Sequence, residues 1–156
     1  NVKYVTIDMW EPYRDVAKSF LPNAIVAVDP FHVIEHLCRD FENLRISLMK
    51  QCACDSNGYC LLKKWNWLLN KDGIDLDNAK AYNHRFQTTL NRRDLLMMIK
   101  DTFPILGEAY ELKEYYRRLN KTATYEEAVE KYHYAVRLFN NSGIPQYDEF
   151  ASILVK

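Results

Sequence analysis

The stretch that decides the fold is Val2-Lys3-Tyr4-Val5-Thr6-Ile7-Asp8, an apolar run that ends in a carboxylate. β-branched and aromatic residues dominate it, which predicts a β-strand covered on both faces. Met9 to Pro12 then break the alternation, and Pro12 suits the first turn of a helix. Asp8 therefore follows the end of a strand. Ligands gather at such positions in α/β folds, so Asp8 has either a functional role or the structural role of capping the next turn.

A helix and a second strand are predicted directly after this stretch. Residues 12–20 carry apolar side chains at helical spacing, and Ala-Ile-Val-Ala-Val at 24–28 is typical of a buried strand. Together they predict a compact βαβ unit. Two strands do not make a stable core, so either later helices cover them or strands of a longer chain complete the sheet. Because the first residue is Asn1 rather than Met, we expect a piece of a longer protein.

The segment Asp29-Pro30-Phe31-His32 opens the next predicted helix. Asp29 has the chemistry of an N-cap and Pro30 that of a first helical residue. An apolar stripe follows with a 3.6-residue period, and charged residues between 39 and 45 are assigned to the opposite face. Asp29 and His32 are three residues apart and can meet on one turn. From the residues alone, they are interpreted as a helix cap with a neighbouring histidine.

The rest of the chain has a helical pattern. Helices are predicted over 59–70, 76–90, 91–101, 105–120 and 147–155, and another follows the capping box Thr124-Tyr125-Glu126-Glu127. The predicted fold class is therefore α/β and mostly helical. Two strands lie in the first thirty residues, and everything after them is expected to be helical.

Composition narrows the classes of function. The chain has 21 basic and 21 acidic residues, so its net charge of zero argues against a large basic nucleic-acid clamp but allows local basic patches. No run is apolar enough to span a membrane, and charged residues interrupt the N-terminal stretch where a signal peptide would need an apolar core. The four cysteines lack the second matching pair of a zinc site, so free thiols are expected.

Several basic and aromatic groups are candidates for DNA contact. Lys63 and Lys64 adjoin Trp65, a combination that suits phosphate contact and base stacking, although an amphipathic helix with a buried tryptophan explains it as well. Arg92-Arg93 and Arg117-Arg118 are further phosphate-contact candidates, or ordinary solvated faces. Tyrosines at helical spacing between 110 and 134 form either an interface or a core rimmed by hydroxyl groups.

In several segments the chain resembles the DDE-type insertion-sequence transposases of the "L-three" branch. Val5-Thr6-Ile7-Asp8-Met9-Trp10, followed by Tyr13, resembles the family's second-aspartate segment, and Asp29-Pro30-Phe31-His32-Val33-Ile34 resembles its Asp-x-Phe-His-Val segment. Weaker likenesses cover 61–65, 110–114, 142–144 and 150–151, in the family's order along the chain.

The resemblance implies a ribonuclease-H-like core whose two aspartates and one glutamate hold two Mg²⁺ or Mn²⁺ ions. Asp8 matches the second aspartate and would be a catalytic metal ligand, with Asp29 and His32 in support. The first aspartate and the Glu-Gly-x-Asn-type glutamate segment have no counterpart here. Residues 1–50 would be a partial core and 51–156 an all-helical insertion. The fragment alone is then expected to be inactive and to hold no metal tightly.

The implied partners are the terminal inverted repeats of a transposon and its target DNA, with a homo-oligomer as a further option. The implied location is the bacterial cytoplasm at the nucleoid. Lys63, Lys64, Arg92 and Arg93 are the candidate DNA contacts. Two other functions stay open: a non-catalytic helical module for interaction or dimerisation, and a ribonuclease-H-like nuclease without strand transfer.

Overall fold

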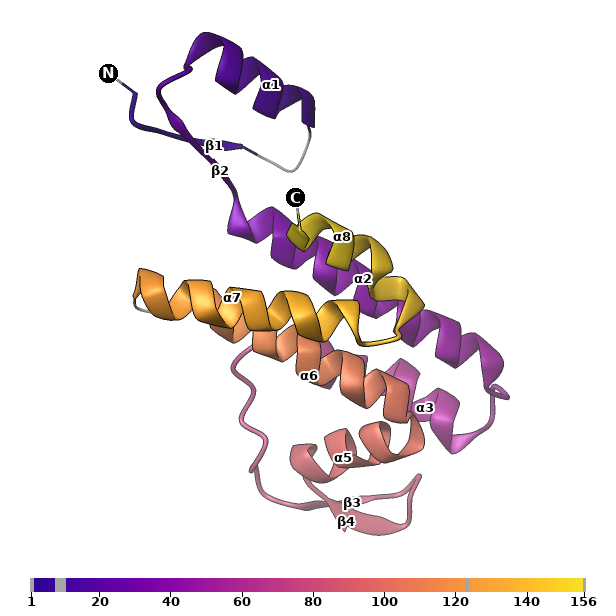
Figure 1. Cartoon of the computed structure of the whole chain (residues 1–156). Helices are drawn as coiled ribbons and strands as arrows, with labels where there is room; N and C mark the ends of the chain where they lie inside the picture. The colour runs from indigo at the N-terminus through magenta and orange to yellow at the C-terminus, as the bar shows by residue number, and fades with distance from the viewer. Residues whose placement is uncertain (1, 8–10, 123, 156) are drawn as a thin grey trace. The chain divides into compact units, whose positions relative to one another are not determined.

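The structure, a computed structural model, describes residues 2–7, 11–122 and 124–155. It divides into two compact units, residues 1–37 and residues 38–156. Figure 1 shows the elements of both units in chain order. The first unit holds β1 (Tyr4–Ile7), α1 (Glu11–Phe20), β2 (Ile25–Val28) and the start of α2 (Pro30–Gln51). The predicted strand–helix–strand–helix order is confirmed.

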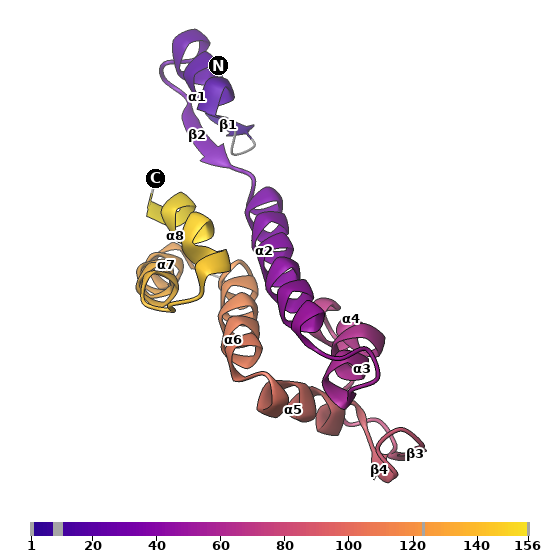
Figure 2. The same ribbon diagram turned by 90° about the vertical axis from the view of Figure 1, so that its right-hand side faces the viewer.

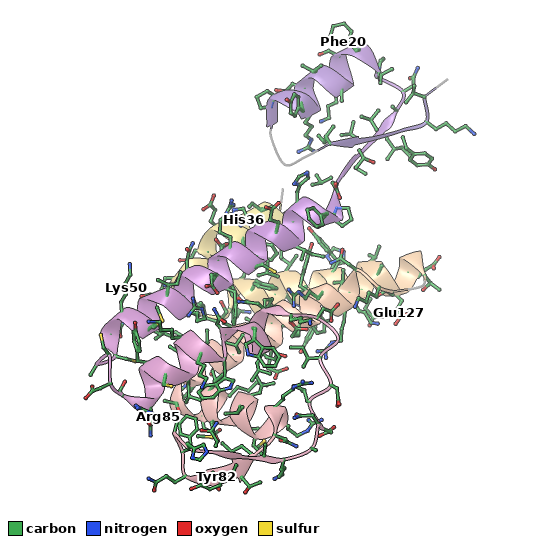
Figure 3. The ribbon with its side chains drawn as sticks, turned by 180° about the vertical axis from the view of Figure 1, so that it is seen from behind. Phe20, His36, Lys50, Tyr82, Arg85 and Glu127 are labelled. Atoms are coloured by element: carbon green, nitrogen blue, oxygen red, sulfur yellow. The ribbon has the colours of Figure 1, made fainter. Side chains whose placement is uncertain are left out.

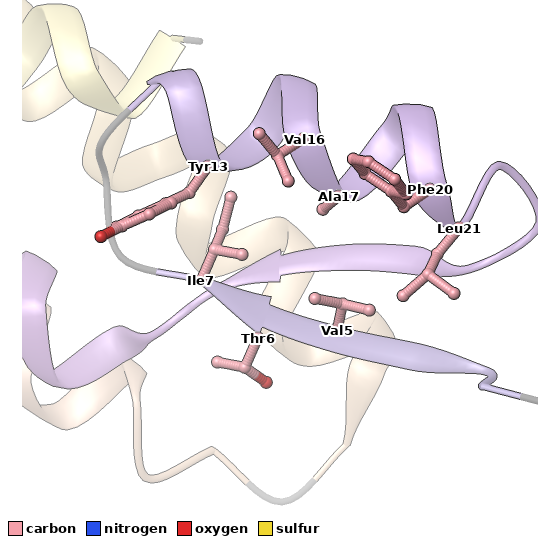
Figure 4. Close-up of a pocket in the computed structure, with 8 residues that line it drawn as sticks. All are labelled: Val5, Thr6, Ile7, Tyr13, Val16, Ala17, Phe20 and Leu21. Carbon is pink, nitrogen blue, oxygen red and sulfur yellow. The ribbon is translucent and has the colours of Figure 1, made fainter.

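In the first unit, β1 and β2 pair in parallel, with Tyr4 opposite Ile25 and Ile7 opposite Val28. Figure 4 shows that Val5 and Ile7 point toward α1, whereas Thr6 points to the other face of the sheet. Because paired residues of a parallel sheet share a face, Tyr4 and Ile25 also lie on that other face, where they are 70% and 60% exposed. The prediction of strands buried on both faces is therefore wrong for this structure, since α1 covers one face only.

The second unit is helical apart from one hairpin. Its helices after α2 are α3 (Asn57–Lys64), α4 (Asn66–Asn70), α5 (Arg92–Thr102), α6 (Pro104–Leu119), α7 (Tyr125–Asn140) and α8 (Asp148–Val155). Figure 2 shows α6 running from α5 to the pair formed by α7 and α8. A 3₁₀ turn, η1 (Pro145–Tyr147), precedes α8.

The hairpin corrects two predictions. Residues 76–90 were expected to be helical, but β3 (Ala81–Asn83) and β4 (Thr88–Leu90) pair antiparallel, with Tyr82 opposite Thr89. The region after residue 50 is therefore not all helical. Asn83 accepts hydrogen bonds from the backbone of Arg85 and Phe86 through its side chain, and Gln87 turns the chain with φ +50°. Such a side-chain turn competes with a helix.

An aromatic cluster forms one part of the core of the second unit. Phe139 lies at its centre, with ring centroids of Phe150, Tyr147 and Tyr116 at 4.8, 5.2 and 6.2 Å. The Tyr147 hydroxyl donates to the Ala109 carbonyl at 2.8 Å. The alternative that the tyrosines belong to a helical core is confirmed for Tyr116, which is 5% exposed.

Helix α2 also corrects the sequence analysis. Asp40 and Arg45 were assigned to its polar face, yet they are 7% and 5% exposed. Arg45 donates to both carboxylate oxygens of Glu42 and, at 2.6 Å, to the Leu62 carbonyl. A buried arginine of this kind ties α2 to α3 through bonds that a hydrophobic pattern does not encode.

Candidate functional site at the carboxyl ends of the parallel strands

The two parallel strands end at the same level. Ile7 is paired with Val28, and the Asp29 amide donates to the Ile7 carbonyl at 2.8 Å. The hydrogen bonds between the two strands thus continue one residue beyond β2, and Asp29 lies directly at the end of the sheet. Asp8, the predicted catalytic residue and metal ligand, follows Ile7 in the sequence and lies outside the described residues.

Asp29 caps helix α2. Its Oδ1 accepts a hydrogen bond from the Phe31 amide at 2.9 Å, and its carbonyl accepts from the His32 amide at 3.2 Å. The other carboxylate oxygen, Oδ2, lies 3.9 Å from His32 Nε2. The cap is therefore observed, and it leaves one oxygen of Asp29 facing the imidazole.

His32 lies between two carboxylates. Its Nδ1 is 3.6 Å from Glu35 Oε2, on the opposite side of the ring from Asp29. The His32 side chain is 44% exposed, so water reaches this cluster. Solvent weakens both of these contacts, because each is partly exposed to water. The two predicted supporting residues are brought together, and Glu35 is a third member that the sequence analysis did not single out.

The described residues do not by themselves form a metal centre. In the ranges 2–7, 11–122 and 124–155, no three His, Cys, Asp or Glu side chains are grouped as metal ligands. The four cysteines are free thiols.

The candidate DNA contacts lie on α3 and α5 of the second unit. The Lys63 ammonium lies 5.2 Å from the ring centre of Tyr59, and that of Lys64 lies 5.1 Å from the ring centre of Trp65. Trp65 is 8% exposed, so its indole packs inside the unit. The amphipathic-helix reading is confirmed for this tryptophan, while both lysine side chains stay exposed.

Arg92 and Arg93 have different surroundings. Arg93 forms two 2.7 Å bonds to the carboxylate of Asp77, and this ion pair lowers the pKa of Asp77. The Arg92 guanidinium lies 5.6 Å from the ring centre of Trp67 and donates to the Asp75 carbonyl. Arg92 thus keeps its charge available, whereas the charge of Arg93 is compensated.

Arg117 takes a structural role. It donates to Glu114 at 2.8 Å, to the Asn70 carbonyl at 3.1 Å and to the Cys38 sulfur at 3.2 Å. Its side chain is 15% exposed, too little for a phosphate contact. Its neighbour Arg118 is exposed and lines a groove together with Arg137, which the sequence analysis missed.

Comparison with known proteins identifies a family. The family model described as "Transposase", that of the ISL3-type DDE transposases, matches residues 1–156. The chain therefore belongs to this transposase family, and membership implies DNA as its partner. Comparisons with curated proteins and with solved structures gave no significant match. Within the described residues, no helix is both long and apolar enough to cross a bilayer.

Proposed function

We propose that the chain is part of the catalytic domain of an insertion-sequence transposase, whose complete form cleaves transposon ends and joins them to target DNA. The observation that carries this proposal is the family match over residues 1–156. The parallel pairing of β1 with β2 supports it, because it brings the ends of the two strands together where a ribonuclease-H-like core would have its site. The protein would act at the nucleoid of a bacterial cell.

Asp8 is proposed as a metal ligand, in keeping with its match to the family's second aspartate. Two Mg²⁺ or Mn²⁺ ions would polarise the attacking oxygen and stabilise the leaving oxygen of the phosphodiester. Carboxylates are the ligands that such ions prefer. Because the described residues contain no group of three such ligands, we propose that the chain alone holds no metal tightly and is inactive.

Asp29 and His32 are proposed to support this site. The Asp29 amide is bonded to the last residue of β1, and the Asp29 carboxylate caps α2 and faces His32. The cluster thus fixes the start of α2 against the end of β1. Lys63, Lys64 and Arg92 are proposed as DNA contacts, with a smaller contribution from Arg93 because of its ion pair with Asp77.

The test is Mg²⁺-dependent cleavage and strand joining of a transposon-end duplex by the full-length protein. Asp8→Asn should abolish cleavage while end binding persists, and Asp15→Asn, an exposed acid on α1, is the matched control. Normal cleavage by Asp8→Asn would overturn the catalytic assignment. Cleavage without joining in the wild type would instead indicate a nuclease.

The supporting role of Asp29 needs a variant that separates the cap from the carboxylate. Serine caps helices about as well as aspartate but carries no charge toward His32. If Asp29→Ser and His32→Gln each lower cleavage while the fold is unchanged, the Asp29–His32 cluster supports the site. Full activity in both variants would leave Asp29 as a helix cap only.

A further inference from the structure

Helices α6 and α7 form a groove in the second unit that the proposed site does not use. It has a volume of about 840 Å³. We call it the tyrosine–arginine groove. Its lining includes Glu108, Glu111, Tyr115, Arg118, Tyr134 and Arg137.

The same short pattern occurs on both walls. Tyr115 is followed three residues later by Arg118 on α6, and Tyr134 is followed three residues later by Arg137 on α7. Residues three apart lie on one face of a helix, so each wall presents a ring and a guanidinium together. The two tyrosine rings meet edge to face across the groove, with centroids 5.6 Å apart.

The tyrosine rings remain available to a ligand. Tyr134 is 46% exposed, and the Arg137 guanidinium lies 5.8 Å from its ring centre. The Tyr115 hydroxyl donates to the Lys131 carbonyl at 3.4 Å, which fixes the orientation of that ring. A fixed aromatic pair beside a cation is the usual platform for an unpaired base.

The charges of the groove favour an anionic ligand at its arginines. Among the residues that the structure describes, neither Arg118 nor Arg137 has a carboxylate within 4 Å, whereas the Glu111 carboxylate is bound by Lys100. Glu108 is the one acid of the lining without an ion pair in the described ranges, and it would repel phosphates near its own position. A ligand with phosphates beside the arginines and bases on the tyrosines satisfies both features.

We propose that the tyrosine–arginine groove binds a single-stranded segment of DNA. Duplex DNA offers phosphates to the arginines but keeps its base faces stacked, so only an unpaired strand uses the tyrosine rings as well. The proposal rests on the proposed function because it takes DNA as the ligand. Strand cleavage and joining would expose such unpaired nucleotides.

The test measures binding of the full chain to a fluorescent single-stranded oligonucleotide of mixed sequence, and to the matching duplex, at several salt concentrations. Arg118→Gln and Arg137→Gln should each weaken single-strand binding and reduce its salt slope by about 0.7. Tyr134→Ala should weaken it roughly tenfold with the slope unchanged, since stacking is not ionic. Glu108→Gln should strengthen it.

Lys50→Gln, which removes an exposed charge at the end of α2, is the matched control and should change the binding little. Equal single-strand binding by the arginine variants and this control would overturn the proposal. So would arginine variants that alter the oligomeric state and leave DNA binding intact, because the groove would then be a protein interface. Cleavage by the full-length protein and by its Asp8→Asn variant is a separate readout. A failure of the single-strand binding proposal can therefore be distinguished from a failure of the catalytic proposal.

Discussion

At the residue scale, buried charged side chains do much to fix the second unit. Lys113 is 0% exposed; its ammonium donates to the Leu69 carbonyl at 2.8 Å and lies 5.0 Å from the ring centres of both Phe41 and Tyr110. Burial lowers the pKa of Lys113, while the bond to Glu114 opposes that shift. A buried charge persists only with such partners, so these residues specify which helices meet.

The clearest test of the structural role of buried charged side chains is the variant Arg45→Lys. Lysine cannot reproduce the forked contact with Glu42 while also reaching the Leu62 carbonyl, so we expect a loss of about 1–3 kcal/mol in the free energy of unfolding. Urea denaturation measures it, and Arg39→Lys, exposed on the same helix, is the control. Equal stability of the two variants would contradict the prediction.

This contact also has a pH dependence with a definite sign. The hydrogen bond from Arg45 is the largest cause that lowers the pKa of Glu42 from its ordinary value of 4.5, with a further bond from Asn70. A lowered pKa in the folded state stabilises the fold above pH 4.5, and this stabilisation is lost as the pH falls through the folded value. The stability difference between wild type and Arg45→Lys should therefore shrink in acid.

Tyr116 is expected to make the stability of the fold depend on pH at the alkaline end. Burial raises its pKa from 10.0 to about 12, because the phenolate would lose its hydration. The neutral phenol stabilises the fold below pH 10, and about 3 kcal/mol is lost as the pH rises through 12. Tyr116→Phe, which keeps the ring, should flatten the fall in stability above pH 10 when urea midpoints are followed against pH. An unchanged alkaline fall would contradict this account.

At the element scale, the start of α5 is fixed by a capping box between Asn91 and Asp94. The Asn91 side chain accepts from the Asp94 amide at 3.0 Å, and Asp94 accepts from the Asn91 amide at 3.1 Å. Asn91→Ala should lower stability by about 1 kcal/mol, whereas Asn91→Ser keeps an acceptor and should lower it much less. Equal urea midpoints for the alanine and serine variants would contradict this role.

Several elements of the fold could be predicted from local sequence patterns. Strands β1 and β2 follow from runs of apolar, largely β-branched residues, and the start of α2 follows from Asp29 as N-cap and Pro30 as first helical residue; the structure confirms these local signals. These signals act within a few residues of chain. They are readable because no distant partner is needed to fix them.

Local sequence patterns do not predict elements whose structure depends on contacts between residues far apart in the chain. The predicted helix 59–70 is interrupted at Trp65, whose buried ring packs 5.6 Å from that of Phe86 in the turn between β3 and β4. Arg85 in that turn donates to Asn57 at 2.9 Å and to the Asp55 carbonyl, which joins the hairpin to the start of α3 (Figure 3). These long-range contacts hold 81–90 in a hairpin, and no local pattern announces them.

Among the candidate site residues, too, some can be predicted from local sequence and others depend on distant contacts. Asp29 and His32 could be predicted because their spacing places them on one helical turn. Arg137 could not, since only the packing of α7 on α6 brings it into a groove with Arg118. The repeated Tyr-x-x-Arg spacing was the one signal in the sequence, and it indicates a shared groove only once the structure shows that the two tyrosine rings are in contact.

At the scale of the whole molecule, the two units differ in how well they bury their apolar residues. In the first unit Tyr13, Val16 and Phe20 of α1 are 50%, 53% and 79% exposed, and they line an open cavity of about 480 Å³ beside β1 (Figure 4). The second unit buries most of the core leucines, such as Leu62, Leu68 and Leu106, at 0%, 1% and 0% exposure. Each large apolar side chain contributes on the order of 2 kcal/mol when fully buried, so the first unit gains much less from burial.

This difference predicts unequal local stability. A two-strand sheet with one open face is marginal in water, so the amides of β1 and β2 should exchange hydrogen much faster than those of α6. Hydrogen exchange of the whole chain, followed by mass spectrometry of its peptides, measures both in one sample. If peptides covering 4–7 and 25–28 were protected as long as those of α6, the open sheet face would not limit stability. If they exchange early, and complete protection appears in the full-length protein, the sheet is completed by the rest of that chain.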